Sequence, residues 1–249
     1  MKTIGLVGGM SWESSIEYYR LINEAIKARL GGFHSAKRVL YSVDFAEIEL
    51  LQRAARWDEA AERLVAAARN VERGGADFLL LCTNTMHKIA DAIQCSVSIP
   101  LLHIADATGQ AVVGRSFKTV GLLGANVTMT ETFYRDRLSS RHGLEVLVPS
   151  EEDRDTVHRI VYDEVCVGCI LDKSRREYVS IIDSLVQRGA QAIILGCTEI
   201  GLLVRQDDCR VPVFDTTRLH AEAAVQYALS EDKPSSVTQS ELSRSQGCH

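Results

Sequence analysis

A cysteine with threonine and glutamate beside it is the part of this sequence best suited to chemistry. The cluster Gly196-Cys197-Thr198-Glu199 follows a short apolar run at 190–195. A thiolate is a competent base or nucleophile, and a helix N-terminus or a nest of backbone amides lowers the pKa of a thiol from its usual value of about 8.5. Cysteine is also a common buried apolar residue, so the polar neighbours decide the interpretation. We predict that Cys197 is the reactive group and that Glu199 orients it or receives a proton.

A second polar cluster follows a matching apolar run 114 residues earlier. Thr83 aligns with Cys197, whereas its neighbour Cys82 should point to the other face of the strand and into the core. Asn84, Thr85 and Thr198 can hydrogen-bond a carboxylate, although these residue types are also good helix caps. His87 lies one helical turn after Thr83, where a supporting role and an ordinary core or surface position are equally expected.

Two further pairs of segments repeat in the same order. Residues 2–9 match residues 118–125, and the Pro-Leu-Leu at 100–102 matches the Pro-Val-Phe at 212–214. Similar buried strands could produce one such match by coincidence, but three in order indicate a duplicated α/β unit of roughly 110 residues.

The apolar periodicity places strands and helices in alternation along the chain. Strands are expected at 3–8, 38–43, 98–102, 119–123, 145–148 and 211–214, with two more ending at residues 82 and 195. Helices are expected at 12–30, 57–73, 85–94, 128–138, 151–167, 173–188 and 219–229, with a loop or short helix at 44–52. Ser11 should cap the first helix, with Ile16, Tyr19, Ile22, Ile26 and Leu30 on its inner face. The run from Thr128 to Glu131 has the form of a capping box that opens the helix toward Leu138.

These elements predict two similar α/β lobes related by a pseudo-two-fold duplication, each a mostly parallel sheet flanked by helices. The expected boundaries are 1–103 plus 212–230 for the first lobe and 104–211 for the second, with a polar, disordered tail at 231–249. Ligands of open α/β sheets bind outside the carboxyl ends of the strands. The two polar clusters should therefore face each other across a cleft between the lobes.

The composition narrows the class of protein. The chain has 249 residues, 46% of them apolar and 24% charged, and a net charge of −5. Without a basic run, nucleic acid and anionic membranes are poor partners. No apolar run approaches 18 residues, and the first strand is too short for a signal peptide, so we expect a cytoplasmic protein. The seven cysteines then imply free thiols.

One Cys-x-x-Cys motif, formed by Cys166 and Cys169, is the remaining cysteine pattern. A structural zinc site would need two further ligands at a recognisable spacing, and a redox pair should open a helix just after a strand. This motif instead ends a helical pattern, and the histidines form no ligand pair at metal-binding spacing. The sequence therefore assigns no metal.

The two clusters together resemble the motifs of the aspartate/glutamate racemase family of cofactor-independent enzymes. The run Thr83-Asn84-Thr85, with His87, is similar to the family's first-lobe motif, and the Cys197 cluster is similar to its second-lobe motif. The opening segment at 8–14, Gly-Gly-Met-Ser-Trp-Glu-Ser, is similar to the aspartate-racemase branch. The resemblance spans residues 2–229. It implies an amino-acid racemase that uses no pyridoxal phosphate, in which two bases exchange the Cα proton on opposite faces and the second-lobe cysteine acts on the L-enantiomer. An assembly as a homodimer is a further expectation.

The sequence departs from that family pattern at two places. Thr83 stands where the first cysteine is expected, and a hydroxyl is a poor base that can still relay or donate a proton; catalysis should then be lopsided toward L-substrates. The lysine of aspartate-specific members falls on Val167, so the substrate, expected to be L-aspartate or L-glutamate, could be broader than aspartate. By position beside the cleft, Met10, Gln52 and Thr128 are added as substrate-binding candidates.

Two other functions remain open at this stage. A decarboxylase or cis–trans isomerase of small dicarboxylates needs one thiol only, which the threonine at position 83 would permit. A two-lobed protein that binds amino acids without turnover is the second alternative.

Overall fold

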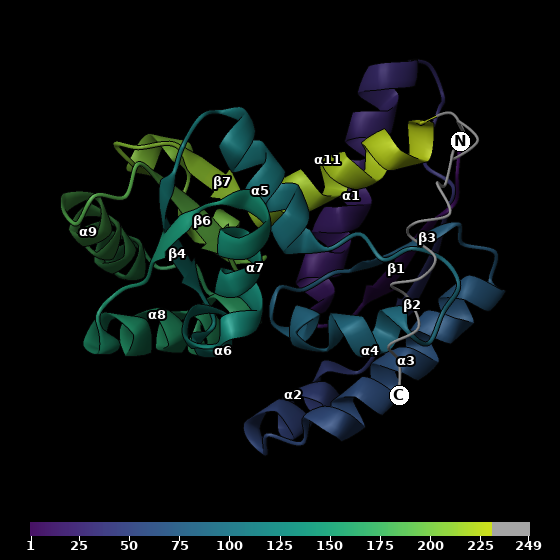
Figure 1. Ribbon diagram of the computed structural model, residues 1–249, viewed down its shortest axis with the longest axis horizontal. Helices are drawn as coiled ribbons and strands as arrows, with labels where there is room; N and C mark the ends of the chain where they lie inside the picture. Colours follow the sequence, from purple (N-terminus) through teal and green to yellow (C-terminus); the bar gives the residue numbers. More distant parts are fainter. Residues whose placement is uncertain (231–249) are drawn as a thin grey trace.

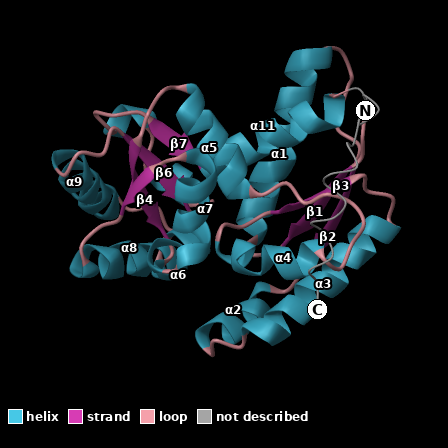
Figure 2. Cartoon of the chain, viewed as in Figure 1, coloured by secondary structure: helices cyan, strands magenta, loops and turns pink. Residues whose placement is uncertain are grey.

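Two strands of similar sequence, β1 (Ile4–Gly8) and β4 (Thr119–Gly124), lie at the centres of two separate parallel sheets. The computed structural model describes residues 1–230, and the predicted tail at 231–249 lies outside the described residues. The first sheet has the order β2-β1-β3 and the second β5-β4-β6-β7, with every pair parallel (Figure 2). The other strands are β2 (Arg38–Ser42), β3 (Phe78–Leu81), β5 (Glu145–Leu147), β6 (Ala192–Gly196) and β7 (Val213–Asp215).

The pairing confirms the predicted duplication. β1 lies between β2 and β3 just as β4 lies between β5 and β6. Beyond β3, the amide of Leu79 donates to the carbonyl of Pro100 at 2.8 Å, and beyond β6 the amide of Ile193 donates to the carbonyl of Pro212 at 2.9 Å. The fold is the predicted pair of α/β lobes.

Two predicted strands need correction. Residues 98–102 form a single bridge between Leu101 and Leu79 instead of a strand. The strand predicted at 211–214 in the first lobe is β7, which pairs with β6 and extends the second sheet. The helix after β7 returns toward the first lobe, as described below. The chain therefore crosses back to the first lobe one element later than expected.

Helices cover both faces of the first sheet because its central strands are buried on both sides. They are α1 (Trp12–Leu30), α2 (Phe45–Arg53), α3 (Trp57–Arg73) and α4 (Ala90–Gln94), which follows a 3-10 turn at Thr85–Ile89. The apolar side of α1 packs on one face and α2, α3 and α4 pack on the other.

The predicted inner face of α1 is partly wrong. Ser11 is its N-cap, as predicted, and Ile22 and Ile26 are buried. Ile16, Tyr19 and Leu30 are exposed. The buried face instead begins with Ser14, Ser15 and Tyr18. Apolar periodicity missed this face because its first turn carries two small hydroxyl side chains: Ser14 bonds the other lobe, and Ser15 accepts from the amide of Gly9 in the turn after β1.

The second sheet is covered in the same way, by α5 and α7 on one face and α8 and α9 on the other. The remaining helices are α5 (Ile104–Gly114), α6 (Asn126–Thr130), α7 (Thr132–His142), α8 (Glu151–Asp163), α9 (Asp172–Gln187), α10 (Ile200–Leu203) and α11 (Thr216–Leu229), with 3-10 turns at Val165–Val167 and Gln206–Asp208. The predicted capping box is wrong: α6 begins at Asn126, before Thr128, and α7 starts anew after Glu131, whose extended ψ of 158° interrupts the helix.

The last helix, α11, joins the lobes. It leaves β7 of the second sheet and packs against α1 of the first lobe as well as α5 (Figure 1). His220 on α11 accepts from the Tyr18 hydroxyl of α1 at 2.7 Å through Nδ1, and its Nε2 donates to the carbonyl of Leu102 at 2.9 Å. These contacts hold the two lobes in one relative orientation around the strand ends.

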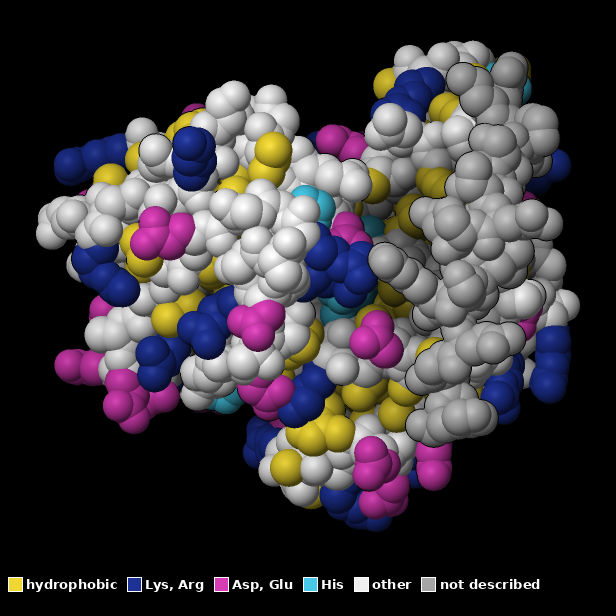
Figure 3. All heavy atoms as spheres, viewed as in Figure 1, with side chains coloured by type: hydrophobic (Ala, Val, Ile, Leu, Met, Phe, Trp, Pro, Cys, Tyr) yellow, Lys and Arg dark blue, Asp and Glu magenta, His cyan; other side chains and the backbone are white. Residues whose placement is uncertain are grey.

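Basic and acidic side chains are interspersed over the visible surface of both lobes outside the grey atoms (Figure 3). Within residues 1–230, no helix combines the length and the apolar character needed to cross a membrane.

Candidate active site

The ends of β3 and β6 bring the two polar clusters to one small cavity. It has a volume of about 30 Å³, and Thr83 and Cys197 both line it. Every site residue predicted from the sequence lines this cavity except Thr128. The lining residues are Met10, Phe45, Gln52, Thr83, Asn84, Thr85, Ala125, Val161, Tyr162, Cys166, Gly196, Cys197, Thr198 and Glu199.

The environment of Cys197 differs from the predicted one. Its Sγ donates a hydrogen bond to Oε2 of Glu199 at 3.0 Å. The Cys166 side chain, burial and the Glu199 charge together raise the pKa of the Cys197 thiol well above its ordinary value. We expected a lowered pKa from a helix N-terminus. The helix that follows, α10, has only four residues, so its dipole is outweighed by two neighbours that disfavour a thiolate.

Glu199 is the centre of a hydrogen-bond network that spans both lobes. Its Oε1 accepts from the hydroxyls of Ser11 and Ser14, each at 2.6 Å, and its Oε2 accepts from Thr198 at 2.6 Å as well as from Cys197. All four bonds are donated to the carboxyl group, which is the pattern of an ionised carboxylate. The side chain is 3% exposed, so this network fixes the one acidic group beside the thiol.

Two of the three hydroxyls that bond Glu199, those of Ser14 and Thr198, also contact each other. Ser14 Oγ and Thr198 Oγ1 lie 2.6 Å apart, yet each already donates its only hydrogen to the carboxylate. The network therefore has one more short contact than it has hydrogens to fill it. The network can take up one further proton without losing a hydrogen bond, and the Cys197 thiol donates to the carboxylate at its centre.

His87 supports Thr83 from behind the cavity. The amide of Ile104 donates to its Nε2 at 3.2 Å, so Nδ1 carries the hydrogen and donates to the carbonyl of Thr83 at 2.8 Å. Burial, followed by the neighbouring His103, holds the pKa of His87 well below its usual value. A neutral His87 thus fixes the backbone of the β3 end, which decides between the two roles left open above.

Asn84 lines the cavity and has an unused hydrogen-bond acceptor. Its Nδ2 donates to the hydroxyl of Thr216 at 3.0 Å, and that hydroxyl donates to the carbonyl of Leu195 at 2.8 Å. Its Oδ1 is buried and has no hydrogen-bond partner among residues 1–230. A buried acceptor without a donor is costly, so this atom is suited to a ligand that brings one.

Thr128 lies behind the cavity wall. Its hydroxyl is 3.4 Å from that of Thr85, and the side chain is fully buried. A Cβ placed on Gly196 would lie 3.5 Å from Thr128 Cγ2 and only 2.9 Å from Leu122. The position before Cys197 thus has no room for a side chain, and Thr128 helps to pack it.

Gln52 and Tyr162 close one side of the cavity from different lobes. The Tyr162 hydroxyl donates to Gln52 Oε1 at 3.5 Å, a long contact, and Gln52 Nε2 lies 2.7 Å from the sulfur of Met86. Met10, from the turn between β1 and α1, is 4% exposed and also lines the cavity.

Sequence reasoning missed several members of this site. Ser14 lies one helical turn after Ser11, and this spacing was the available signal that both face the same side. Cys166 gave no such signal because it enters from the short turn after α8. The structure divides the Cys-x-x-Cys motif: Cys166 lines the cavity and Cys169 is exposed. Val167, where the family lysine was placed, is 63% exposed and points away.

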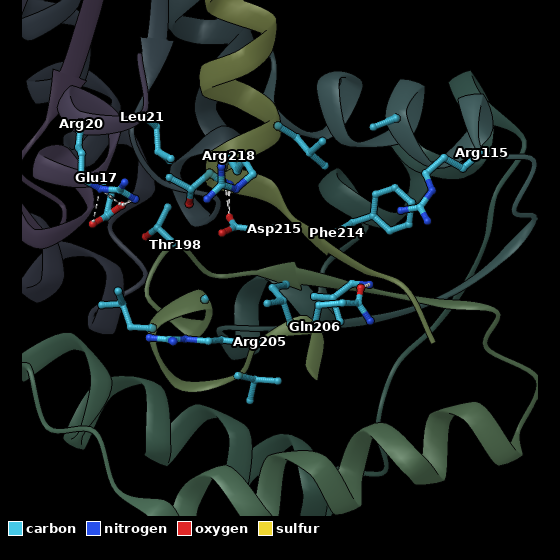
Figure 4. Close-up of a pocket in the computed structure, with 18 residues that line it drawn as sticks. Glu17, Arg20, Leu21, Arg115, Thr198, Arg205, Gln206, Phe214, Asp215 and Arg218 are labelled. Atoms are coloured by element: carbon cyan, nitrogen blue, oxygen red, sulfur yellow. Dashed lines mark hydrogen bonds and ion pairs between the residues drawn. The ribbon is translucent and has the colours of Figure 1, made fainter. Parts of the chain in front are cut away.

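A second cavity, of about 710 Å³, shares Thr198 with the first (Figure 4). Arginines border it, among them Arg115, Arg205 and Arg218, and Asp215 lies between them. It is larger than the cavity at Cys197, but neither the thiol nor Thr83 lines it. The chemistry indicated by the side chains therefore belongs to the smaller cavity.

The fold and the site define a two-lobed α/β enzyme with a thiol and a hydroxyl at equivalent strand ends. The sequence model of the Asp/Glu/hydantoin racemase family matches residues 7–224. The chain therefore belongs to this family and is an amino-acid racemase, an isomerase.

Individual relatives agree with this assignment. A candidate Asp/Glu racemase from Yersinia pestis is 53% identical, with a TM-score of 0.87 over 92% of this chain and 100% of that one. An aspartate racemase homologue from Pyrococcus horikoshii OT3 is 32% identical, with a TM-score of 0.81 over the same shares. The broad specificity amino-acid racemase RacX of Bacillus subtilis is 24% identical over 173 residues, 70% of this chain and 74% of RacX.

Proposed function

We propose that the enzyme racemises aspartate and glutamate without a cofactor. In this proposal Cys197 removes the Cα proton of the L-enantiomer and Thr83 returns a proton to the opposite face. One observation carries it: the two side chains come from equivalent strand ends of the duplicated lobes and line a single cavity. A substrate held there would present its two faces to the two lobes.

Cys197 must lose its proton before it can act as a base. Its raised pKa keeps the thiol protonated in the free enzyme. Glu199 accepts the thiol hydrogen, and the hydroxyl network around that carboxylate has a place for one more proton. The ammonium group of a bound amino acid adds a nearby positive charge that favours the thiolate. We infer that substrate binding drives the proton from sulfur to Glu199 and so activates the base only when the site is occupied.

The remaining cavity residues supply the expected polar contacts of an amino acid. Asn84 Oδ1 would accept from the ammonium group, filling its vacant position. The hydroxyl of Thr85 would donate to a carboxylate oxygen. Thr198 gives its hydrogen to Glu199 and would offer only its oxygen, as an acceptor. Within the described part of the chain, no lysine or arginine lines this cavity. A side-chain carboxylate would therefore meet neutral donors such as Gln52, which supports acceptance of other amino acids of similar size.

The cavity is too small for a substrate as it stands. A volume of about 30 Å³ holds no more than a few water molecules. Entry therefore requires the lobes or the side chains between them to move apart. The Tyr162–Gln52 contact, at 3.5 Å, is the weakest of the hydrogen bonds that close the cavity, and we propose that opening begins there.

The proposed reaction also requires a reduced thiol. The six cysteines within residues 1–230 are all free. A reducing compartment such as the cytoplasm would keep Cys197 in this state.

Chiral chromatography tests this function directly. L-aspartate and L-glutamate are incubated separately with the enzyme, and both the D-enantiomer and any decarboxylated product are quantified. Formation of the D-enantiomer to equal amounts is the expected result. Loss of a carboxyl group would support the decarboxylase alternative, and ligand-induced thermal stabilisation with no product would support a binding protein. Either of these two outcomes would overturn the proposal.

A further inference from the structure

Three potential metal ligands gather at one end of the cavity. The sulfur atoms of Cys166 and Cys197 and a carboxylate oxygen of Glu199 all lie within 4.8 Å of one another. The two cysteines come from different elements, the turn after α8 and the end of β6. Such a cluster goes beyond what proton transfer at Cα needs, because Cys166 has no role in that step.

We propose that this cluster binds a thiophilic divalent cation of the zinc class. Two thiolates and one carboxylate are a ligand set that Zn²⁺ favours, and three protein ligands leave the fourth tetrahedral position to water. Zinc lies about 2.3 Å from sulfur and about 2.0–2.2 Å from a carboxylate oxygen, so in tetrahedral geometry these ligands are roughly 3.5–3.8 Å apart. The observed cluster requires only small side-chain shifts to reach that spacing.

The surroundings favour a cation. Glu199 is held by the hydroxyls of Ser11 and Ser14, and such outer contacts orient a ligand before the metal arrives. Within residues 1–230 no basic side chain lines the cavity to oppose a positive ion. On binding, each thiol exchanges its hydrogen for a sulfur–metal bond, and two protons leave to solvent.

This site is different from the one that the Cys-x-x-Cys motif suggested. Cys169 is exposed and does not line the cavity, so Cys166 pairs with the distant Cys197 instead. Cys169→Ser therefore serves as a matched control for Cys166→Ser. The two substitutions change the same type of residue three positions apart, and only one of them removes a ligand.

The consequence for the reaction rests on the proposed function. An ion on Cys197 occupies the electron pair that would accept the Cα proton. Zinc should therefore inhibit racemisation, in competition with the amino acid, and the site would make the enzyme sensitive to free thiophilic metal.

Cobalt is the probe for the test, because Co²⁺ bound by thiolates absorbs light in a charge-transfer band. The full-length, reduced enzyme is titrated with CoCl₂ in the absence of oxygen, alongside Cys166→Ser, Cys197→Ser and Cys169→Ser. We expect one Co²⁺ per chain with thiolate absorption in the wild type and in Cys169→Ser. Cys166→Ser and Cys197→Ser should each bind at least tenfold more weakly, with reduced thiolate absorption. Circular dichroism of each variant confirms that it is folded.

The inference is overturned if the wild type shows no thiolate–cobalt band, if Cys166→Ser keeps it, or if Cys169→Ser loses it. The readout does not depend on catalysis. A cobalt site in an enzyme that leaves amino acids unchanged would refute the proposed function alone, whereas racemisation without a cobalt site would refute this inference alone.

Discussion

Ser11 and Glu199 are joined by a 2.6 Å hydrogen bond although 188 positions separate them in the chain. Ser11 is the N-cap of α1 in the first lobe, and Glu199 follows the strand of the second lobe that carries the thiol. The bond therefore ties the start of one lobe's first helix to the group that receives the thiol hydrogen in the other. Opening the cavity would strain this contact, so the proposed mechanism links closure of the cavity to activation of the base.

Replacement of Glu199 by glutamine should weaken both the fold and the reaction. Four donors point at this carboxylate, and an amide offers one acceptor atom and an NH₂ group that opposes two of them. We expect Glu199→Gln to lower the free energy of unfolding by about 1–3 kcal/mol and to lower kcat. Urea denaturation and chiral chromatography measure the two effects.

Glu152→Gln is the matched control for that substitution, because Glu152 is exposed in the first turn of α8. Glu152→Gln should change neither the free energy of unfolding nor kcat appreciably. A Glu199→Gln variant with wild-type stability and kcat would contradict the role assigned to the network.

Loss of the Thr83 hydroxyl should separate two steps of the reaction. In Thr83→Val, Cys197 can still remove the Cα proton of an L-substrate, but no group returns a proton to the opposite face. General acid–base groups contribute about 10²–10⁴-fold to a rate, so the rate of inversion should fall by a factor of that order. Exchange of the L-substrate's Cα hydrogen with D₂O should fall much less. Equal losses in inversion and exchange would show that Thr83 has another function, and Thr83→Ser should retain both activities.

The two directions of the reaction should differ in kcat. Enantiomers have equal free energy, so kcat/KM must be the same for both. Because a threonine hydroxyl is a poorer base than a thiol, D-substrates should have a lower kcat and a proportionally lower KM. Circular dichroism measurements of initial rates with each enantiomer give kcat and KM in the two directions. Equal kcat values would refute the mechanism in which Thr83 is the weaker base.

Acid should destabilise the fold through three buried histidines. Burial lowers the pKa of His220 to about 4. Burial and the charge of Arg137 lower the pKa of His103 to about 2, and the pKa of His87 is also well below its usual value. The unfolded chain, with histidine pKa values near 6.5, therefore binds more protons in acid. Their contribution to stability is complete above about pH 6.5 and declines as the pH falls toward 4.

Each histidine contributes up to about 1.4 kcal/mol per pH unit in that range. Urea unfolding at pH 7.5, 6.0 and 5.0 checks the slope. His220→Gln should unfold with a smaller pH dependence than the wild type, whereas His34→Gln, at an exposed position, should not. An unfolding free energy that stays constant from pH 7.5 to 5.0 would contradict these assignments.

The pairing of Thr83 with Cys197 could be predicted from the sequence because the duplication places them at the same point of the same motif. The face of α1 could not be predicted from apolar periodicity, since Ser14 faces inward to donate to Glu199 and Ser15 faces inward to accept from the amide of Gly9. Cys166 and the raised pKa of Cys197 were missed together: a local motif shows the helix that follows a thiol but not the side chains that reach it from elsewhere in the fold.

Exchange of the Cα hydrogen tests the central claim, that Cys197 is the base. Proton NMR of L-aspartate and L-glutamate in D₂O is recorded with the wild type, Cys197→Ala and Cys169→Ala. We predict that the Cα–H signal decays with the wild type and with Cys169→Ala, and that Cys197→Ala slows the decay by about 10²–10⁴-fold. Decay at the wild-type rate in Cys197→Ala would contradict the account.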